Sequence, residues 1–231
     1  MIFLKFVLSA PLQSWGEAAR WEQRTTAAMP TKSAIIGLLG SCLGIPRGNE
    51  CLNKLNSELL VAIRADQPGR VMTDYQTVNT LYGEALPSAN GGHRKKGEGI
   101  VTPKQYLQDA RFTVFLWGNE ETLAACFQAM EHPKWAVYLG RKSCVPAVPV
   151  KPEWVEAASP EEAVKIFSLE ERKHSASMVQ VEMDAKPNDS LEDNQRMITR
   201  RDSILRADRN EYAVRWVKTF PVKSGGDESC T

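Results

Sequence analysis

The sequence has little of what metal sites and catalytic clusters require. Its three histidines are far apart, and its five cysteines form no CxxC pair and lie at no metal-ligand spacing from a histidine. No Ser-His-Asp set is recognisable. These absences predict free thiols in a reducing cytoplasm, no metal site and no cofactor.

The chain also lacks an excess of charge of one sign and a long hydrophobic run. Its 29 Lys and Arg residues nearly cancel its 28 Asp and Glu residues, so any nucleic-acid site must come from local clustering of charge. The apolar run at the amino terminus is about nine residues long, too short to span a bilayer. Because Lys5 interrupts it and no small-residue cleavage site follows, we expect a buried first strand rather than a signal peptide. The sequence therefore predicts a cytoplasmic protein without a membrane partner.

The chain does contain clear strand and helix patterns. Runs rich in β-branched and aromatic residues predict strands at 2–10, 59–65, 71–78, 110–118 and, in AVYLG, 136–140. Helical spacing of apolar residues predicts helices at 30–45 and 120–131. In the first helix, Thr31 or Ser33 can cap the amino end and Gly44 the carboxy end. Gly37 and Gly40 weaken an isolated helix and so indicate a close backbone approach on their face.

The order of these elements predicts an α+β fold. Strand, helix, strand, insertion, strand, helix, strand is the order of a ferredoxin-like (RRM-like) domain, which we place at residues 1–149. Within it, residues 79–104 hold Gly, Pro, Asn and Lys without apolar periodicity and are too many for an ordinary connection, which predicts an inserted hairpin or arm. Beyond a proline-rich boundary, residues 150–231 predict a small β-rich C-terminal unit. Its expected elements are a short acidic helix at 159–165 and strands at 178–183 and 211–217.

The arm tip carries the densest local positive charge. NGGHRKKGEG places Arg94, Lys95 and Lys96 between glycines, and Lys104 follows shortly after. Phosphates would satisfy these cations, and the glycines let the backbone follow a partner. A solvated loop kept soluble by its lysines explains the same pattern. His93 could act as a general base in RNA cleavage, with Lys95 or Lys96 stabilising the phosphorane, although a glycine-flanked loop holds such geometry poorly.

Two further segments are candidates for anion binding. YLGRKSC combines a glycine turn with two cations and a hydroxyl, which together form a possible phosphate cradle at Gly140, Arg141, Lys142 and Ser143. The helix that begins in PTKS offers free backbone N–H groups, beside which Lys32 and Ser33 could help to hold an anion. Simple capping by Thr31 and Ser33 is the more frequent role of such residues.

Several segments, taken together, resemble a known family. APLQSWG after the first strand, PTKSAIIGLLGSCLGI at the first helix and YLGRKSCVP near residue 140, with DYQTV and YLQDARFTVFLW between them, resemble the CasD-type subunits of subtype I-E CRISPR Cascade complexes, in the RAMP superfamily. The resemblance covers residues 1 to about 150 with specific motifs and extends more loosely to about 220.

The resemblance implies a ferredoxin-like domain with an arm called the thumb, in a subunit that binds the 5′ handle of the CRISPR RNA (crRNA) without cutting it. The implied protein partners are the backbone subunits of the complex and the large subunit, and target DNA is met only through the complex. The RNA contacts carried over to this sequence are Gln13, Ser14, Trp15, Lys32, Ser33, Lys104, Gly140, Arg141, Lys142 and Ser143. Arg94, Lys95 and Lys96 match the family less closely, so they rest on charge and position alone.

The alternative is an enzyme. In subtype I-C the corresponding subunit is a metal-independent endoribonuclease that produces the crRNA, which would make His93 the general base here. The motifs match the I-E form, and only one histidine lies near the proposed groove, so the sequence favours binding without catalysis. A generic RRM-type binder would need the aromatic RNP strand motif, which is missing. A purely structural assembly subunit would instead place the basic sites against protein.

Overall fold

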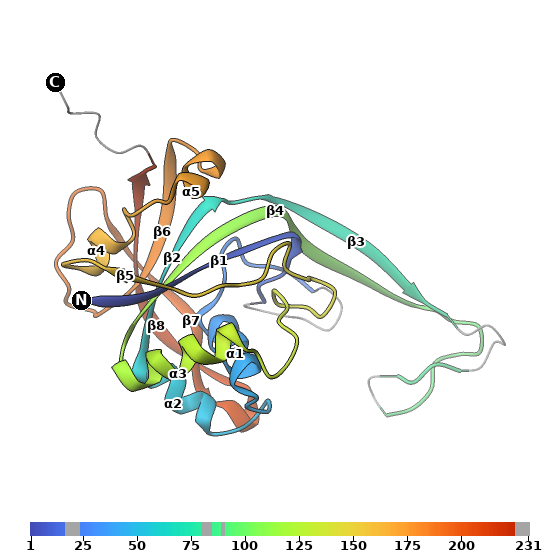
Figure 1. The fold of residues 1–231 in the computed structure, drawn as a ribbon. Helices are drawn as coiled ribbons and strands as arrows, with labels where there is room; N and C mark the ends of the chain where they lie inside the picture. The colour runs from blue at the N-terminus through green and yellow to red at the C-terminus, as the bar shows by residue number, and fades with distance from the viewer. Residues whose placement is uncertain (17–23, 80–84, 89–90, 225–231) are drawn as a thin grey trace.

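The computed structural model describes residues 1–16, 24–79, 85–88 and 91–224, with the side chains of residues 169 and 174 outside the description. In this part of the chain, eight strands form one antiparallel sheet in the order β5-β1-β4-β2-β6-β8-β7, with β3 paired to β4 (Figure 1). The strands are β1 (Ile2–Gln13), β2 (Leu59–Gln67), β3 (Arg70–Val78), β4 (Ile100–Gly118), β5 (Glu153–Glu156), β6 (Met178–Ala185), β7 (Arg196–Arg206) and β8 (Glu211–Lys223). The helices are α1 (Lys32–Leu43), α2 (Cys51–Glu58), α3 (Glu120–Glu131), α4 (Pro160–Ala163), α5 (Leu169–His174) and the 3₁₀ turn η1 (Ala207–Arg209).

The predicted ferredoxin-like core is present, but its fourth strand lies elsewhere than expected. The strands β5-β1-β4-β2 have the 4-1-3-2 order of that fold, with α1 and α3 as the two crossovers. The strand expected at 136–140 is wrong, because Leu139 and Cys144 close this segment into a turn, with a 2.8 Å hydrogen bond from the Leu139 N–H to the Cys144 carbonyl. The edge position beside β1 is taken by β5, where Val155 pairs with Phe3. The core is therefore completed only after residue 149, the predicted end of the domain.

Helix α1 forms where its capping residues predict it. The Thr31 hydroxyl accepts a hydrogen bond from the Ala34 N–H, and Gly44 ends the helix in the left-handed region at φ 73°. A Cβ built on Gly40 would lie 2.7 Å from Leu52 of α2, so the predicted close approach is confirmed there. At Gly37 the prediction is wrong, since a Cβ at that position meets nothing within 4 Å. Gly37 faces open space on the exposed side of the helix.

Each face of the sheet is covered by a different set of elements. Helices α1, α2 and α3 pack on one face, over a core that includes Phe6, Ile35 and Leu123. On the other face, the segment that holds α4 and α5 covers a second cluster around Phe115 and Phe167. This two-sided burial is what the apolar runs of the central strands predict.

Arg64, buried on the second face of the sheet, joins the sheet to the segment that holds α4 and α5. Its guanidinium is fully buried and donates hydrogen bonds to Asp66 at 2.6 Å, to Glu171 of α5 at 2.7 Å and to the Val164 carbonyl at 2.7 Å. It also lies 3.5 Å from the centre of the Phe167 ring. A buried charge with this many partners holds the α4–α5 segment on the sheet.

The predicted C-terminal unit is β-rich, and its strands extend the same sheet. β6 pairs with β2, with Ala62 opposite Met183, and β8 and β7 continue beyond it. The sequence did not predict β7, because four arginines in residues 196–206 hide its alternating pattern. The C-terminal strands are thus structurally continuous with the ferredoxin-like core.

The predicted arm is a long two-stranded ribbon that projects from the body (Figure 1). β3 pairs with the first half of β4, from Arg70 opposite Gln108 to Val78 opposite Ile100. The arm therefore begins at residue 70, earlier than the predicted 79, because β3 belongs to the ribbon rather than to the core. None of the helices in the described part of the chain combines the length and hydropathy needed to cross a membrane.

Candidate nucleic-acid interface

Two of the predicted RNA-binding segments meet where the arm joins the body. The Ser14 N–H donates a 3.1 Å hydrogen bond to the Leu139 carbonyl, which brings the loop after β1 against the turn at 140–143. A Cβ on Gly140, whose φ is 93°, would lie only 1.6 Å from the Ser14 carbonyl oxygen. Glycine is therefore required at this contact. We call residues 14–16, 103–106 and 140–143 the arm base.

Arg141 fixes the turn to the root of the arm. Its guanidinium donates hydrogen bonds to the carbonyls of Gln105 at 3.0 Å and Arg24 at 2.9 Å, and it lies 4.6 Å from the centre of the Tyr106 ring. The two hydrogen bonds use two of its five N–H donors within the protein. Arg141 therefore has a structural role in addition to the positive charge it brings to the arm base.

Lys142 and Ser143 are the exposed part of this turn. Both side chains face solvent, and within the described residues no carboxylate lies within ion-pair distance of the Lys142 ammonium. The Cys144 N–H closes the turn with a 2.8 Å bond to the Arg141 carbonyl, so the backbone that carries this cation is ordered internally. An unpaired cation next to a hydroxyl on a closed turn is suited to a phosphate group.

The side chains of Gln13, Ser14 and Trp15 lie inside the protein instead of on its surface. They are 0%, 4% and 1% exposed. The Gln13 amide donates a 2.6 Å hydrogen bond to the Ala110 carbonyl, and the Ser14 hydroxyl donates to the Gln105 carbonyl at 3.3 Å. This placement corrects the expectation that these side chains contact RNA, because in this structure they are buried below the surface of the arm base and support it.

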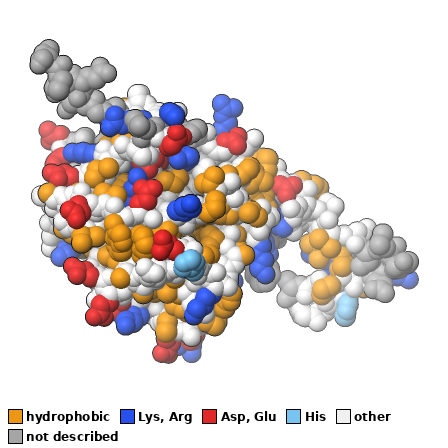
Figure 2. Space-filling view, in the orientation of Figure 1, with side chains coloured by type: hydrophobic (Ala, Val, Ile, Leu, Met, Phe, Trp, Pro, Cys, Tyr) orange, Lys and Arg blue, Asp and Glu red, His pale blue; other side chains and the backbone are white. Residues whose placement is uncertain are grey.

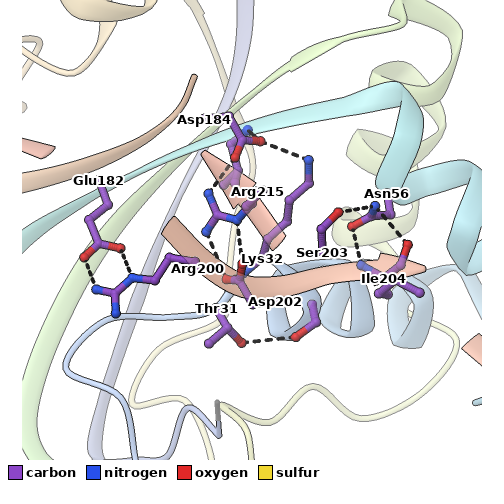
Figure 3. A network of polar contacts seen from close by, with 12 residues as sticks. Thr31, Lys32, Asn56, Glu182, Asp184, Arg200, Asp202, Ser203, Ile204 and Arg215 are labelled. Atoms are coloured by element: carbon purple, nitrogen blue, oxygen red, sulfur yellow. Dashed lines mark hydrogen bonds and ion pairs between the residues drawn. The ribbon is translucent and has the colours of Figure 1, made fainter. Parts of the chain in front are cut away.

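Lys32 also has both its ammonium and its backbone N–H bound to carboxylates of the same chain. Lys32 is 6% exposed, its ammonium forms a 2.9 Å ion pair with Asp184, and its backbone N–H donates a 2.7 Å hydrogen bond to Asp202 (Figure 3). The anion at the amino end of α1 is therefore a carboxylate from β7, which corrects the prediction of an external anion beside Lys32. Ser33 is half-buried, and its hydroxyl lies 3.3 Å from that of Thr31.

Arg215 completes this network from β8. Its guanidinium bonds Asp202 at 2.6 and 2.9 Å and Asp184 at 2.5 Å. Burial by itself lowers the pKa of Arg215, but the hydrogen bonds and charges of the two aspartates outweigh it and raise that pKa above its ordinary value. Two cations and two carboxylates thus balance in a closed group between α1 and the C-terminal strands (Figure 3).

The arm carries its cations in two separate places. Lys104, half-buried on the ribbon, donates to the side chain of Gln76. At the far end, Arg94 lies 3.5 Å from Glu98, while Lys95, Lys96 and His93 are exposed. Residues 91–99, which include His93, therefore lie at the end of the ribbon that is farther from the body (Figure 1). On the visible face of the body, basic and acidic side chains are interspersed, in agreement with the near-zero net charge (Figure 2).

A groove of about 450 Å³ runs from the arm base along α1 to the turn between β7 and β8. Sequence reasoning did not find it, because its walls come from distant segments, and its only sequence signal was the glycine content of α1. The lining at the arm base is Ser14, Gly16 and Gly140. The floor on α1 includes Ser33, Gly37 and Ser41. The walls include Arg47, Trp135, Tyr138, Arg206, Asn210 and Tyr212.

Comparisons with known proteins agree with one another. The model of the family described as CRISPR-associated protein (Cas_Cas5) matches residues 3–218. The CRISPR system Cascade subunit CasD of Escherichia coli (strain K12) is 33% identical over 173 residues, with 70% of this chain and 75% of that protein covered. A chain of a solved CRISPR RNA-guided surveillance complex has a TM-score of 0.73 at 27% identity, covering 96% of this chain and 90% of that one. A crystal structure of a Cas protein has a TM-score of 0.69 at 25% identity, covering 96% and 95%.

Proposed function

Because this chain belongs to the CRISPR-associated protein (Cas5) family, we propose that it is a subunit of a type I-E Cascade surveillance complex and that it binds the 5′ handle of the crRNA. The relative from which the subunit role is transferred is the Cascade subunit CasD, and the matched structure is a chain of an RNA-guided complex. The handle is a single-stranded RNA segment. Its phosphates and unpaired bases are what the described surface has to recognise.

The observation that carries the proposal is the convergence at the arm base. Segments near residues 14, 104 and 141, far apart in the sequence, are tied together by hydrogen bonds between backbone groups and by Arg141. The exposed Lys142 ammonium and Ser143 hydroxyl lie on this ordered surface. The handle would cross it with a phosphate on Lys142, and the arm tip would add the charges of Lys95 and Lys96 along the strand.

We propose that the subunit binds the RNA without cutting it. General acid–base cleavage needs a histidine held within hydrogen-bond reach of the reacting hydroxyl. In the described residues the His93 side chain is exposed at the arm tip and is held by no side-chain hydrogen bond. The charges of Lys95 and Lys96 beside it suit phosphate binding equally well. The alternative, an RNA-processing enzyme with His93 as general base, remains the contrary outcome of the test below.

The proposal includes the backbone subunit and the large subunit of Cascade as protein partners, with target DNA met through the complex in the cytoplasm. One face of the ribbon supports a protein contact. Val71, Tyr75 and Val101 are 60%, 67% and 47% exposed there, and strand alternation and register place them on the same face. Exposed apolar side chains grouped in this way are typical of interaction surfaces.

The first test is incubation of the purified chain with labelled repeat RNA and with mature handle RNA, in EDTA, beside a His93→Ala variant. We expect both proteins to retard the handle RNA on a native gel and to leave both RNAs intact on a denaturing gel. Discrete cleavage that disappears in the variant would instead establish the processing enzyme. Absence of retardation with a folded chain would reject handle binding.

A further inference from the structure

Gly37 has an unexplained energetic cost in the middle of α1. A glycine in a helix interior destabilises the helix relative to alanine. At Gly40 this cost has a packing reason, the contact with Leu52, but around Gly37 a Cβ meets nothing within 4 Å. Gly37 instead lies on the floor of the groove, where the helix backbone is open to a ligand.

The walls of the groove combine rings and cations. Tyr138 and Trp135, 39% and 47% exposed, come from the segment after α3, and Tyr212 comes from β8. Arg47 donates two hydrogen bonds to the Asn210 side chain, at 3.3 and 3.1 Å. In the described part of the chain no carboxylate lies within ion-pair distance of Arg47, so its charge is available to an anion.

The C-terminal wall is fixed before any ligand binds. Asn56 of α2 donates a 2.9 Å hydrogen bond to the Ser203 hydroxyl and accepts a 3.1 Å bond from the Ile204 N–H (Figure 3). One turn earlier on the same helix, Asn53 accepts a 3.1 Å bond from the Ala207 N–H. The Asp202–Lys32 contact ties the same strand to the start of α1. Because these contacts already order the wall, ligand binding does not have to supply the free energy for ordering it.

We propose that this groove binds one unstacked nucleotide of the single-stranded RNA, with its base beside the aromatic rings and its phosphate on Arg47. The inference rests on the proposed function and extends it to residues 204–212, which the sequence analysis did not assign to RNA binding. The volume of about 450 Å³ is in the range of small-ligand sites. RNA is favoured over a protein segment because the groove carries an arginine that meets no carboxylate among the described residues, and because Ser14, Gly16 and Gly140 make the groove continuous with the arm base.

The test is a substitution on the floor of the groove that fills part of its volume. Gly37→Gln places a side chain in space that is open in the structure, and because glutamine is the better helix former, the fold is preserved or stabilised. Ala125→Gln is the matched control, since Ala125 is an exposed small residue in the interior of α3 and does not line the groove. The probe is a labelled RNA copied from the 5′ end of the crRNA that copurifies with the complex. It is applied to the full chain and to the assembled complex.

We expect Gly37→Gln to weaken RNA binding about tenfold, with an unchanged or higher melting temperature, and Ala125→Gln to bind like the wild type. Tyr212→Leu, which keeps apolar volume but removes the ring, should weaken binding and abolish photocrosslinking of 4-thiouridine RNA to this strand. If the wild type binds and Gly37→Gln binds equally well, the groove inference is overturned while handle binding stands. If Gly37→Gln binds RNA normally but fails to enter the complex, the groove holds a protein segment and the inference is also wrong. If the folded wild type binds no RNA, the proposed function and this inference fail together.

Discussion

The carboxylate of Asp202 accepts a 2.7 Å hydrogen bond from the backbone N–H of Lys32, which lies 170 positions earlier in the sequence. The bond occupies the positive end of the α1 dipole, where an anionic ligand would otherwise bind. Arg215 bonds the same carboxylate from β8 at 2.6 and 2.9 Å. The C-terminal strands therefore determine the position of the helix that forms the groove floor.

Replacing this carboxylate should cost substantial stability. Asp202→Asn keeps the shape but removes a buried charge that Arg215 and the helix end require, so we expect the free energy of unfolding to fall by about 2–3 kcal/mol in urea denaturation. Asp208→Asn is the control, because Asp208 is 50% exposed and pairs with Arg206 at the surface. Equal effects of the two substitutions would show that the buried network contributes no more to the free energy of unfolding than a surface ion pair does.

The contact between Gly140 and Ser14 predicts a strong effect of one methyl group. Gly140→Ala combines a positive φ with a clash against the Ser14 carbonyl, so it should lower the free energy of unfolding by at least about 2 kcal/mol. Gly37→Ala should do the opposite and raise it by about 1 kcal/mol, because its Cβ enters open space on a helix. Thermal melts of the two variants measure both signs, and a neutral Gly140→Ala would contradict the described geometry.

The loss of folding stability at acidic pH should depend on Glu171. Burial raises the pKa of its carboxyl, but hydrogen bonding and the charges of Lys5 and Arg64 outweigh burial and hold that pKa below its ordinary value of 4.5. The folded state therefore binds this proton more weakly than the unfolded chain does. The resulting stabilisation is complete above pH 4.5 and is lost as the pH falls through the lowered pKa.

Glu171→Gln should consequently have a lower urea midpoint than the wild type at neutral pH, and the difference should narrow as the pH falls below 4.5. Glu170→Gln serves as the control, since Glu170 is 66% exposed and pairs with Lys173 at the surface. Its pH profile should run parallel to that of the wild type. A constant gap between Glu171→Gln and the wild type at all pH values would exclude the linkage.

RNA affinity should depend on salt and on Lys142. If about five phosphates are neutralised, a fourfold rise in salt should weaken binding about a hundredfold, and Lys142→Gln should reduce the salt slope by about 0.7. Lys54→Gln, at a 73% exposed position on α2, should leave both the affinity and the slope unchanged. A flat salt response of the wild type would reject electrostatic binding at the arm base.

Local sequence signals were sufficient for several elements. The caps of α1 and the apolar spacing of α1 and α3 predicted both helices, because capping and helical periodicity depend on residues within one or two turns. AVYLG had the composition of a strand but formed a turn, since a short apolar run becomes a strand only if a neighbouring strand is available for pairing. In the structure β1 pairs with β5 instead.

In the candidate site too, some features were predictable from the sequence and others depended on the tertiary structure. The sequence by itself indicated the glycine and cations of YLGRKSC, the charged arm tip and the family, because these depend on residue identity and short-range order. Only the tertiary structure decided that the Lys32 charge is neutralised by Asp184, that Trp15 is buried, and that β7 and β8 form a wall of the groove on α1. The physical reason is that burial and pairing of a side chain depend on which distant segments the sheet brings against it.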